Sequence, residues 1–184
     1  MQFSHSLSTP IPNSFRVEQV RGMFDLAREA ESREEFTVEL PEPEEEWMLG
    51  AIVGPSGSGK TSIARAAFGE AVYTPGEWPR ERAVIDGFGE ASLHEITSLL
   101  TAVGFGSPPA WLRPYHVLSG GERFRADLAR ALLTARTGDG GEPGLVVFDE
   151  YTSVVDRRAA EIGSLAVNRA LRAGRPRVRL VVVT

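Results

Sequence analysis

The sequence predicts an α/β fold in which a mostly parallel sheet is flanked by helices and carries a small antiparallel β flap. Three apolar runs without alternation, at 47–53, 145–148 and 178–184, are typical of strands buried on both faces. Helical patterns lie between these runs, which favours parallel strands joined by crossover helices. Two segments of alternating apolar and polar residues, at 15–20 and 36–40, indicate the antiparallel flap.

The first half of the chain divides at several turn signals. Residues 1–14 contain two prolines and four serines, and we expect them to form a flexible arm before a folded domain at 15–184. An acidic turn at 41–46 separates the second alternating strand from the first apolar one. A helix is predicted at 60–68, directly after a glycine-rich loop. The stretch at 73–82 contains prolines and is expected to be irregular.

The second half alternates helices with strands. Ser92 and Glu95 have the spacing of a capping box, and the helix that they begin is predicted to end near Val103. Apolar residues at helical spacing, including Phe124 and Leu128, predict a second long helix. In chain order, the elements expected here are a short strand at 83–86, a helix at 92–103, turns at 104–114, a helix at 120–136, a loop at 138–144, a strand at 145–148, a helix at 156–171 and a strand at 178–184.

Composition places the chain among ordinary globular proteins. It has 184 residues, of which 42% are hydrophobic and 24% are charged. The formal net charge of −5 gives no general attraction to nucleic acid or to an anionic membrane. The absence of cysteine excludes disulfides and thiolate metal sites. Because the start is unlike a signal peptide and no apolar run approaches ~20 residues, we expect a cytoplasmic protein.

Residues 54–61 read GPSGSGKT, which matches the phosphate-binding pattern G-x-x-x-x-G-K-[ST]. A glycine-rich loop between a strand and a helix directs backbone N–H groups at phosphate oxygens, and the helix N-terminus adds positive potential. We expect Lys60 to reach the β- and γ-phosphates and Thr61 to ligate Mg²⁺. The strand before the loop and the helix after it disfavour a glycine turn without a ligand. The sequence thus predicts a P-loop NTPase.

Asp149 and Glu150 follow the apolar strand at 145–148. One carboxylate at such a strand end can hold Mg²⁺, and a second can orient or deprotonate an attacking water. We therefore assign Asp149 to the metal and Glu150 to the water. A solvated strand end is the alternative, and the phosphate loop in the same chain disfavours it.

A second candidate anion site lies at 118–122, which reads LSGGE just before a predicted helix. Ser119 is a typical N-cap, and the two glycines expose amides at the positive helix end. One chain has little use for two distant γ-phosphate sites, whereas two facing chains would complete each other's sites. Plain helix capping is the alternative reading of this motif.

The order of these motifs resembles the ATPase domain of the ABC superfamily, from Phe15 to nearly the end of the chain. The resemblance implies that ATP and Mg²⁺ are held between two copies arranged head to tail. It matches Asp156 to the D-loop aspartate, a catalytic position together with Glu150 and Lys60, and Phe24 to an adenine-stacking aromatic. An ordinary core phenylalanine is the alternative for Phe24. The nucleotide-contacting positions implied by the resemblance are Phe24, Gly54, Pro55, Ser56, Gly57, Ser58, Gly59, Lys60, Thr61, Ser62, Ser119, Gly120, Gly121 and Glu122.

Several features depart from the family pattern. No glutamine follows Gln19, so the Q-loop glutamine has no match, and Asp86 or Glu90 is a weak substitute. The segment between Lys60 and Ser119 is short, which implies a reduced helical subdomain. Tyr151 stands where the family usually has proline. These departures put the transporter role and the details of catalysis in doubt.

The family's switch histidine follows the last sheet strand, and none of His5, His94 and His116 lies there. We expect a C-terminally truncated domain with low ATPase activity. The runs at 103–115 and 148–156 resemble bacterial and phage ABC-type ATPases, some of which are fused to a predicted acetyltransferase domain. The resemblance therefore allows a fused or partner domain of that kind beyond Thr184.

The leading hypothesis is a soluble ABC-type ATPase that hydrolyses ATP as a head-to-tail homodimer. The alternatives are a nucleotide-regulated binding module, the ATP-binding subunit of an ABC transporter with a docking groove near 101–111, and a DNA-acting ATPase. Five arginines at 169–179 are more simply a solvated face and linker than a nucleic-acid contact, so nucleic acid has no direct support.

Overall fold

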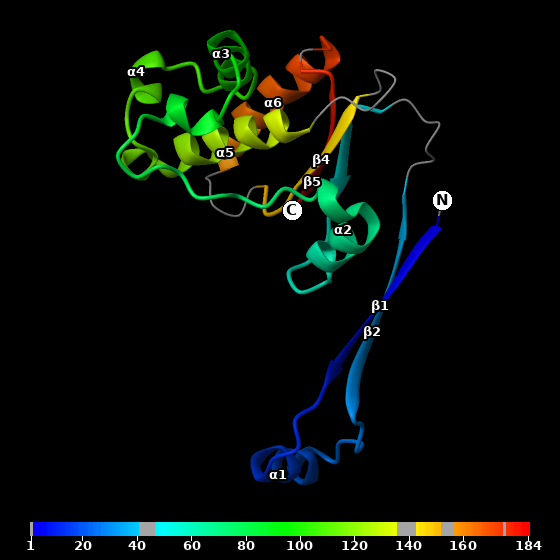
Figure 1. The fold of residues 1–184 in the computed structure, drawn as a ribbon. Helices are drawn as coiled ribbons and strands as arrows, with labels where there is room; N and C mark the ends of the chain where they lie inside the picture. Colours follow the sequence, from blue (N-terminus) through cyan, green and yellow to red (C-terminus); the bar gives the residue numbers. More distant parts are fainter. Residues whose placement is uncertain (1, 41–46, 136–142, 152–156, 175) are drawn as a thin grey trace. The chain divides into compact units, whose positions relative to one another are not determined.

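The computed structural model describes the chain except for residues 1, 41–46, 136–142, 152–156 and 175 (Figure 1). The expected loop at 138–144 and the start of the expected helix at 156 thus fall mainly outside the described residues. The chain forms two compact units, residues 1–45 and residues 46–184, so the units divide after residue 45 rather than after residue 14.

The first unit is an antiparallel hairpin with a helix between its strands. β1 (Gln2–Pro10) pairs with β2 (Glu31–Glu39) along its full length. The expectation of an irregular arm at 1–14 is wrong for β1, whose alternating side chains follow strand periodicity. α1 (Phe15–Phe24) replaces the strand expected at 15–20. Ser14 Oγ caps the helix by accepting from Val17 N–H (3.3 Å). The strand prediction rested on only six alternating residues and did not take this cap into account.

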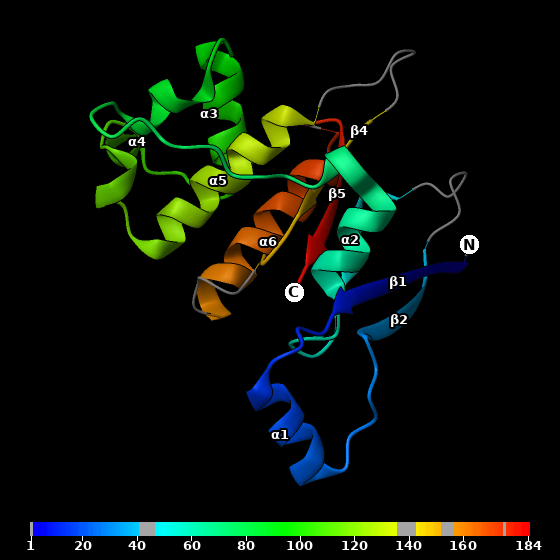
Figure 2. The ribbon, with the colours of Figure 1, turned by 60° about the horizontal axis from the view of Figure 1, so that its bottom comes forward.

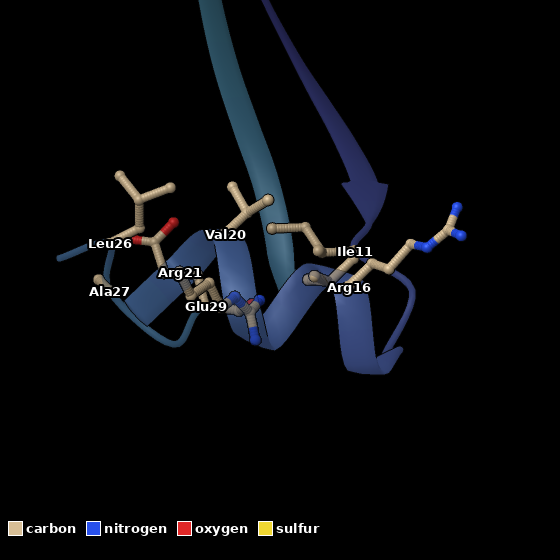
Figure 3. A pocket seen from close by; sticks show the side chains of 8 residues that line it. Ile11, Arg16, Val20, Arg21, Leu26, Ala27 and Glu29 are labelled. Carbon is tan, nitrogen blue, oxygen red and sulfur yellow. The ribbon is translucent and has the colours of Figure 1, made fainter. Parts of the chain in front are cut away.

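A shallow pocket lies beside α1, lined by residues of the helix and of the two loops that flank it (Figure 3). Val20 and Leu26 contribute apolar surface. Arg21 donates to Glu18 Oε1 (2.8 Å) and to the Glu29 carbonyl (2.6 Å), so its charge is already paired. The pocket contains none of the predicted phosphate or metal contacts.

The second unit contains the parallel sheet that the sequence predicts. β3 (Leu49–Ile52) and β4 (Gly144–Phe148) both pair in parallel with β5 (Val178–Val183), which gives the order β3-β5-β4. Val72 makes an isolated parallel bridge to Val147 on the free side of β4. The antiparallel flap is also present, but it is formed by β1 and β2 of the first unit.

The helices of the second unit largely match the prediction. They are α2 (Lys60–Phe68), α3 (Leu93–Ala102), α4 (Pro108–Trp111), α5 (Gly120–Thr134) and α6 (Arg157–Arg172), with the short 3₁₀ turns η1 (Gly69–Ala71), η2 (Val84–Phe88) and η3 (Tyr115–Val117). The strand expected at 83–86 is wrong, because only Ala83 makes a bridge, to Pro114, and the chain then turns into η2. Ser92 and Glu95 form the predicted capping box of α3.

Alternate residues of β4 and β5 enter two different cores. Val146, Phe148 and Leu180 belong to the larger core, which also contains residues of α3, α5 and α6. Val147 and Val181 belong to a smaller core with Ala64 of α2. Figure 2 shows α2 on one side of the sheet and α5 and α6 on the other. The apolar runs without alternation are therefore strands buried on both faces, as predicted.

Candidate functional site

The glycine-rich loop connects β3 to α2 and depends on its glycines. Gly57 (φ 80°) and Gly59 (φ 75°) have left-handed backbone conformations that side chains disfavour. At Gly54, an added Cβ would lie 2.8 Å from Ser58 Oγ. Gly59 is the N-cap of α2 and supplies no side-chain cap, and the first turn of α2 has no acidic residue. The positive end of α2 thus faces the loop without a neutralising side chain.

The Lys60 ammonium lies inside this loop. Lys60 Nζ donates to the carbonyl oxygens of Gly54 (2.9 Å) and Pro55 (2.8 Å). Ser58 Oγ donates to the same Pro55 carbonyl (2.8 Å). The loop therefore surrounds a positive charge. Lys60 can bind a phosphate if its ammonium group gives up a hydrogen bond to a carbonyl oxygen and donates to a phosphate oxygen instead.

The two acidic residues lie at the same end of the sheet as the loop, beyond the carboxyl ends of the parallel strands. β3 ends at Ile52, opposite Val183 of β5, and β4 ends at Phe148, opposite Val182. The carboxyl ends of the outer strands are therefore level within one residue. Neighbouring strands are about 4.8 Å apart, so the backbones at these two ends are separated by about 10 Å. This spacing suits a triphosphate with a metal ion between a loop and a carboxylate.

The turn after β4 has an unusual backbone. Glu150 has φ 53°, a left-handed conformation that is uncommon for a residue other than glycine. Its N–H donates to Asp149 Oδ1 (2.9 Å). Asp149 is half-buried and Glu150 is exposed, so both carboxylates lie within reach of solvent and of a ligand at the sheet edge.

The N-terminal tip of α5 is ordered by a reciprocal capping box. Ser119 Oγ accepts from Glu122 N–H (3.3 Å), while Glu122 Oε2 accepts from Ser119 N–H and Ser119 Oγ (both 2.8 Å). Arg113 adds an ion pair to Glu122 Oε1 (2.9 Å). The hydrogen bond from the Ser119 amide is the largest cause that lowers the pKa of Glu122. Ser119 and Gly120 are exposed, so this tip is open to a second molecule.

Sequence comparison relates the chain to ATP-binding proteins of importers, although no family model matches it. Zinc import ATP-binding protein ZnuC 1 of Hahella chejuensis is 33% identical over an alignment of 123 residues, and the match covers 57% of this chain and 46% of that protein. Hemin import ATP-binding protein HmuV of Bradyrhizobium diazoefficiens is 30% identical over 143 residues, covering 59% of this chain and 53% of that protein. The chain thus spans about half the length of these curated relatives.

Solved structures agree on the fold. A putative ABC transporter ATP-binding protein from Pyrococcus furiosus has a TM-score of 0.53 at 17% identity, covering 74% of this chain and 77% of that one. A bacterial Atm1-family ABC exporter with ATP bound has a TM-score of 0.52 at 20% identity, covering 74% and 29%. The chain has the fold of an ABC ATPase.

This fold confirms the predicted fold class, and the similarity to import ATP-binding proteins agrees with the resemblance inferred from the motifs. In the part of the chain that the structure describes, no helix is long and apolar enough to cross a membrane. The same described residues include no cluster of three or more His, Cys, Asp or Glu side chains that could hold a metal ion by themselves.

For some of the residues that the sequence assigns to the site, the assigned role stays a prediction. Phe24 ends α1 in the first unit and is 68% exposed, so it is not the core phenylalanine of the alternative reading. Its contact with adenine stays a prediction. Asp156 lies outside the described residues. Asp86 lies in η2 and Glu90 is exposed just after it, and nothing tests either as a substitute for the missing glutamine.

Two features were missed by sequence reasoning. Trp78 Nε1 and the Tyr115 hydroxyl donate to the two carboxylate oxygens of Asp127 (2.7 and 2.6 Å), and Arg130 lies over the Trp78 ring (4.0 Å). The only sequence signal for this cluster is that Trp78 and Tyr115 are aromatic residues in or beside proline-containing segments. The second feature is Tyr151, which the sequence showed as a departure from the family but whose burial it did not reveal.

Proposed function

We propose that this chain binds ATP with Mg²⁺ and hydrolyses it. The observation that carries the proposal is the strand order β3-β5-β4, which brings the phosphate loop and the Asp149–Glu150 pair to one edge of a parallel sheet. Ligands of open α/β sheets bind outside the carboxyl ends of the strands, and this edge is such a place.

The phosphate loop would hold the triphosphate of ATP. Its backbone N–H groups and the first turn of α2 supply positive potential, and Lys60 supplies a full charge. Ser56, Ser58 and Ser62 offer hydroxyl groups along the same segment. Phosphate oxygens would replace the carbonyl oxygens that Lys60 Nζ now contacts.

Thr61 and Asp149 would hold Mg²⁺. Both side chains are half-buried oxygen donors, which Mg²⁺ prefers, and together with phosphate oxygens and water they can complete its coordination. When bound, the ion neutralises charge that develops on the phosphates. Glu150 would orient and deprotonate the attacking water from the adjacent turn.

A second copy of the chain would complete the site. The exposed Ser119 tip of one protomer would meet the γ-phosphate bound by the Lys60 loop of the other, with Gly120 and Gly121 allowing close approach. ATP would then stabilise a homodimer because its phosphates contact both protomers. Asp156 and Phe24 keep their proposed roles in catalysis and in adenine stacking.

Turnover by these 184 residues is proposed to be slow, because none of His5, His94 and His116 matches the switch histidine that the resemblance implies. The cytoplasm is the proposed location. An acetyltransferase-like domain beyond Thr184 remains a proposal that rests on the sequence resemblance alone.

The test combines nucleotide binding, turnover and molecular mass. We expect the unsubstituted chain to bind ATP, Glu150→Gln to retain binding but lose turnover and accumulate as a dimer with ATP, and Lys60→Ala to lose binding. Light scattering after size-exclusion chromatography measures the dimer. ATP binding with turnover that Glu150→Gln leaves unchanged would contradict the enzymatic role and favour a nucleotide-regulated binding module.

A second candidate function is favoured by the relatives, whose names describe ATP-binding proteins for zinc and hemin import. The chain would then act as the ATP-binding subunit of an importer, with a membrane partner docked near 101–111. Co-purification with a membrane protein, lost after charge substitutions at the exposed Leu112, would support this role. DNA-stimulated turnover that weakens with salt would instead support the DNA-acting alternative.

A further inference from the structure

Tyr151 connects the turn of the two carboxylates to four surrounding elements. It directly follows Glu150 and is only 5% exposed. Its backbone N–H donates to the carbonyl of Val183, the last residue of β5 (2.9 Å). Its ring packs edge-on against Phe124 of α5 (5.1 Å) and Phe148 of β4 (6.1 Å), and its hydroxyl accepts from Ser164 Oγ of α6 (3.2 Å).

The residue between these anchors has a strained backbone. Glu150 has φ 53°, and a non-glycine residue keeps a left-handed conformation only where its surroundings enforce it. Phe148 is buried immediately before the acidic pair, and Tyr151 is buried immediately after it. The pair is thus held between two buried aromatic rings that contact each other.

We infer that Tyr151 is the positioning residue of Glu150. Its buried ring and its backbone hydrogen bond fix the end of the turn, and this fixes the left-handed conformation of Glu150 and the direction of its carboxylate. Since Phe124 lies on α5, whose N-cap is Ser119, the Tyr151 ring also joins the carboxylate turn to the helix of the second anion site. The inference rests on the proposed function for the role of Glu150 but not for its geometry.

A matched control separates positioning from packing. Phe105 is another buried aromatic residue of the same core, 2% exposed, and it lies on the connection between α3 and α4, where its carbonyl accepts from Trp111 Nε1. Phe105→Ala removes a ring of similar size without touching the turn after β4. Tyr151→Phe removes only the hydroxyl and keeps the ring.

The first measurement needs no nucleotide. In crystal structures of the 184-residue chain, we expect Tyr151→Ala to release Glu150 from its positive φ, whereas Tyr151→Phe and Phe105→Ala retain it. If Tyr151→Ala does not fold, Tyr151→Leu provides a less disruptive loss of the aromatic ring. A Glu150 that keeps its left-handed conformation without the Tyr151 ring overturns the inference.

The second measurement uses ATP turnover. We expect Tyr151→Ala to lower kcat about tenfold or more while the dissociation constant for ATP changes less than about twofold, because positioning affects the reacting geometry rather than phosphate binding. Tyr151→Phe restores most of the turnover, and Phe105→Ala retains it. Equal kcat values for Tyr151→Ala and Phe105→Ala overturn the inference. If the unsubstituted chain binds no ATP, the proposed function fails instead, and the crystal structures still decide the positioning.

Discussion

Gly54 is the residue where the phosphate loop has the least space. A Cβ there would lie 2.8 Å from Ser58 Oγ, which itself donates to the Pro55 carbonyl. The loop could relieve this contact only by moving or by giving up that hydrogen bond. The net contribution of such a bond is about 1 kcal/mol, which corresponds to roughly fivefold in affinity.

We therefore expect Gly54→Ala to weaken ATP binding about fivefold or more. Adding Ser58→Ala removes the clashing oxygen and should recover part of the affinity, which isothermal titration calorimetry would measure. Gly106→Ala is the control, since an added Cβ there has no neighbour within 4 Å. Equal affinities for Gly54→Ala and Gly106→Ala would show that the close contact has no effect.

Glu122 affects how the free energy of unfolding falls in acid. Its pKa lies below its ordinary value of 4.5, chiefly because its carboxylate accepts from the Ser119 amide. A lowered pKa means that this stabilisation is complete above the ordinary value and is lost as the pH falls through the lowered one. We expect Glu122→Gln to reduce the free energy of unfolding at pH 7 and to flatten its decline below about pH 4.5.

Urea denaturation at a series of pH values measures this effect. Glu70→Gln, at an exposed position outside the capping box, serves as the control. A decline in acid that is equally steep with and without the Glu122 carboxylate would contradict the prediction.

At the scale of elements, α5 binds two segments of the chain, those that contain Trp78 and Tyr115, through Asp127. Asp127 accepts from Trp78 Nε1 and from the Tyr115 hydroxyl, and the two rings stack with centroids 4.8 Å apart. Burial, followed by the bond to Asp127, raises the pKa of Tyr115. Gly87 is required beside this cluster, because its Cβ would overlap the Trp78 ring.

We expect Asp127→Ala to lower the free energy of unfolding by ~2–4 kcal/mol, because two partly buried donors lose their acceptor. Asp127→Asn retains one acceptor oxygen and is expected to cost less. Chemical denaturation measures both, and a double-mutant cycle with Tyr115→Phe isolates the hydroxyl bond. A coupling energy near zero would show that the Tyr115 bond contributes nothing.

The elements that the sequence predicted well carry local signals. The helices that begin after Ser92 and Ser119 have capping boxes, and α2 follows its glycine loop. The elements predicted wrongly were decided by contacts that the local pattern does not contain. Residues 2–10 form a strand because residues 31–39 pair with them. Val84 begins η2, and its N–H donates to the carbonyl of Arg113, which lies far along the sequence.

The candidate site divides in the same way. The loop, Asp149, Glu150 and the Ser119 tip were identified from their motifs, because each motif specifies its own chemistry over a few residues. The Trp78–Asp127 bond joins residues 49 positions apart, and Tyr151 contacts Ser164 and Phe124, which are 13 and 27 positions away. Such pairs leave no periodicity in a single sequence.

At the scale of the whole molecule, the proposed composite site predicts complementation between two inactive chains. Lys60→Ala removes the phosphate contact of its own loop but keeps the Ser119 tip. Gly120→Asp places a negative charge at the helix N-terminus, which favours the helix and repels a γ-phosphate. A mixed dimer of these chains retains one intact site out of two.

We expect each variant alone to be inactive and an equal mixture to recover about a quarter of the turnover, since half of randomly paired dimers are mixed and each has one intact site. A coupled assay of phosphate release measures the recovery. Mixing Lys60→Ala with Glu150→Gln is the control that yields no complete site if both residues act from the same protomer. An active Gly120→Asp chain on its own would contradict the shared site.

The carbonyl oxygens around Lys60 Nζ also bear on how quickly a ligand can enter. Lys60 Nζ donates to the carbonyl oxygens of Gly54 and Pro55, so the loop is already folded around the ammonium. Entry of a nucleotide then requires one side chain to swing rather than a loop to refold. We expect association to be fast and governed by diffusion and charge, so that differences in affinity among loop variants arise mainly in the rate of escape.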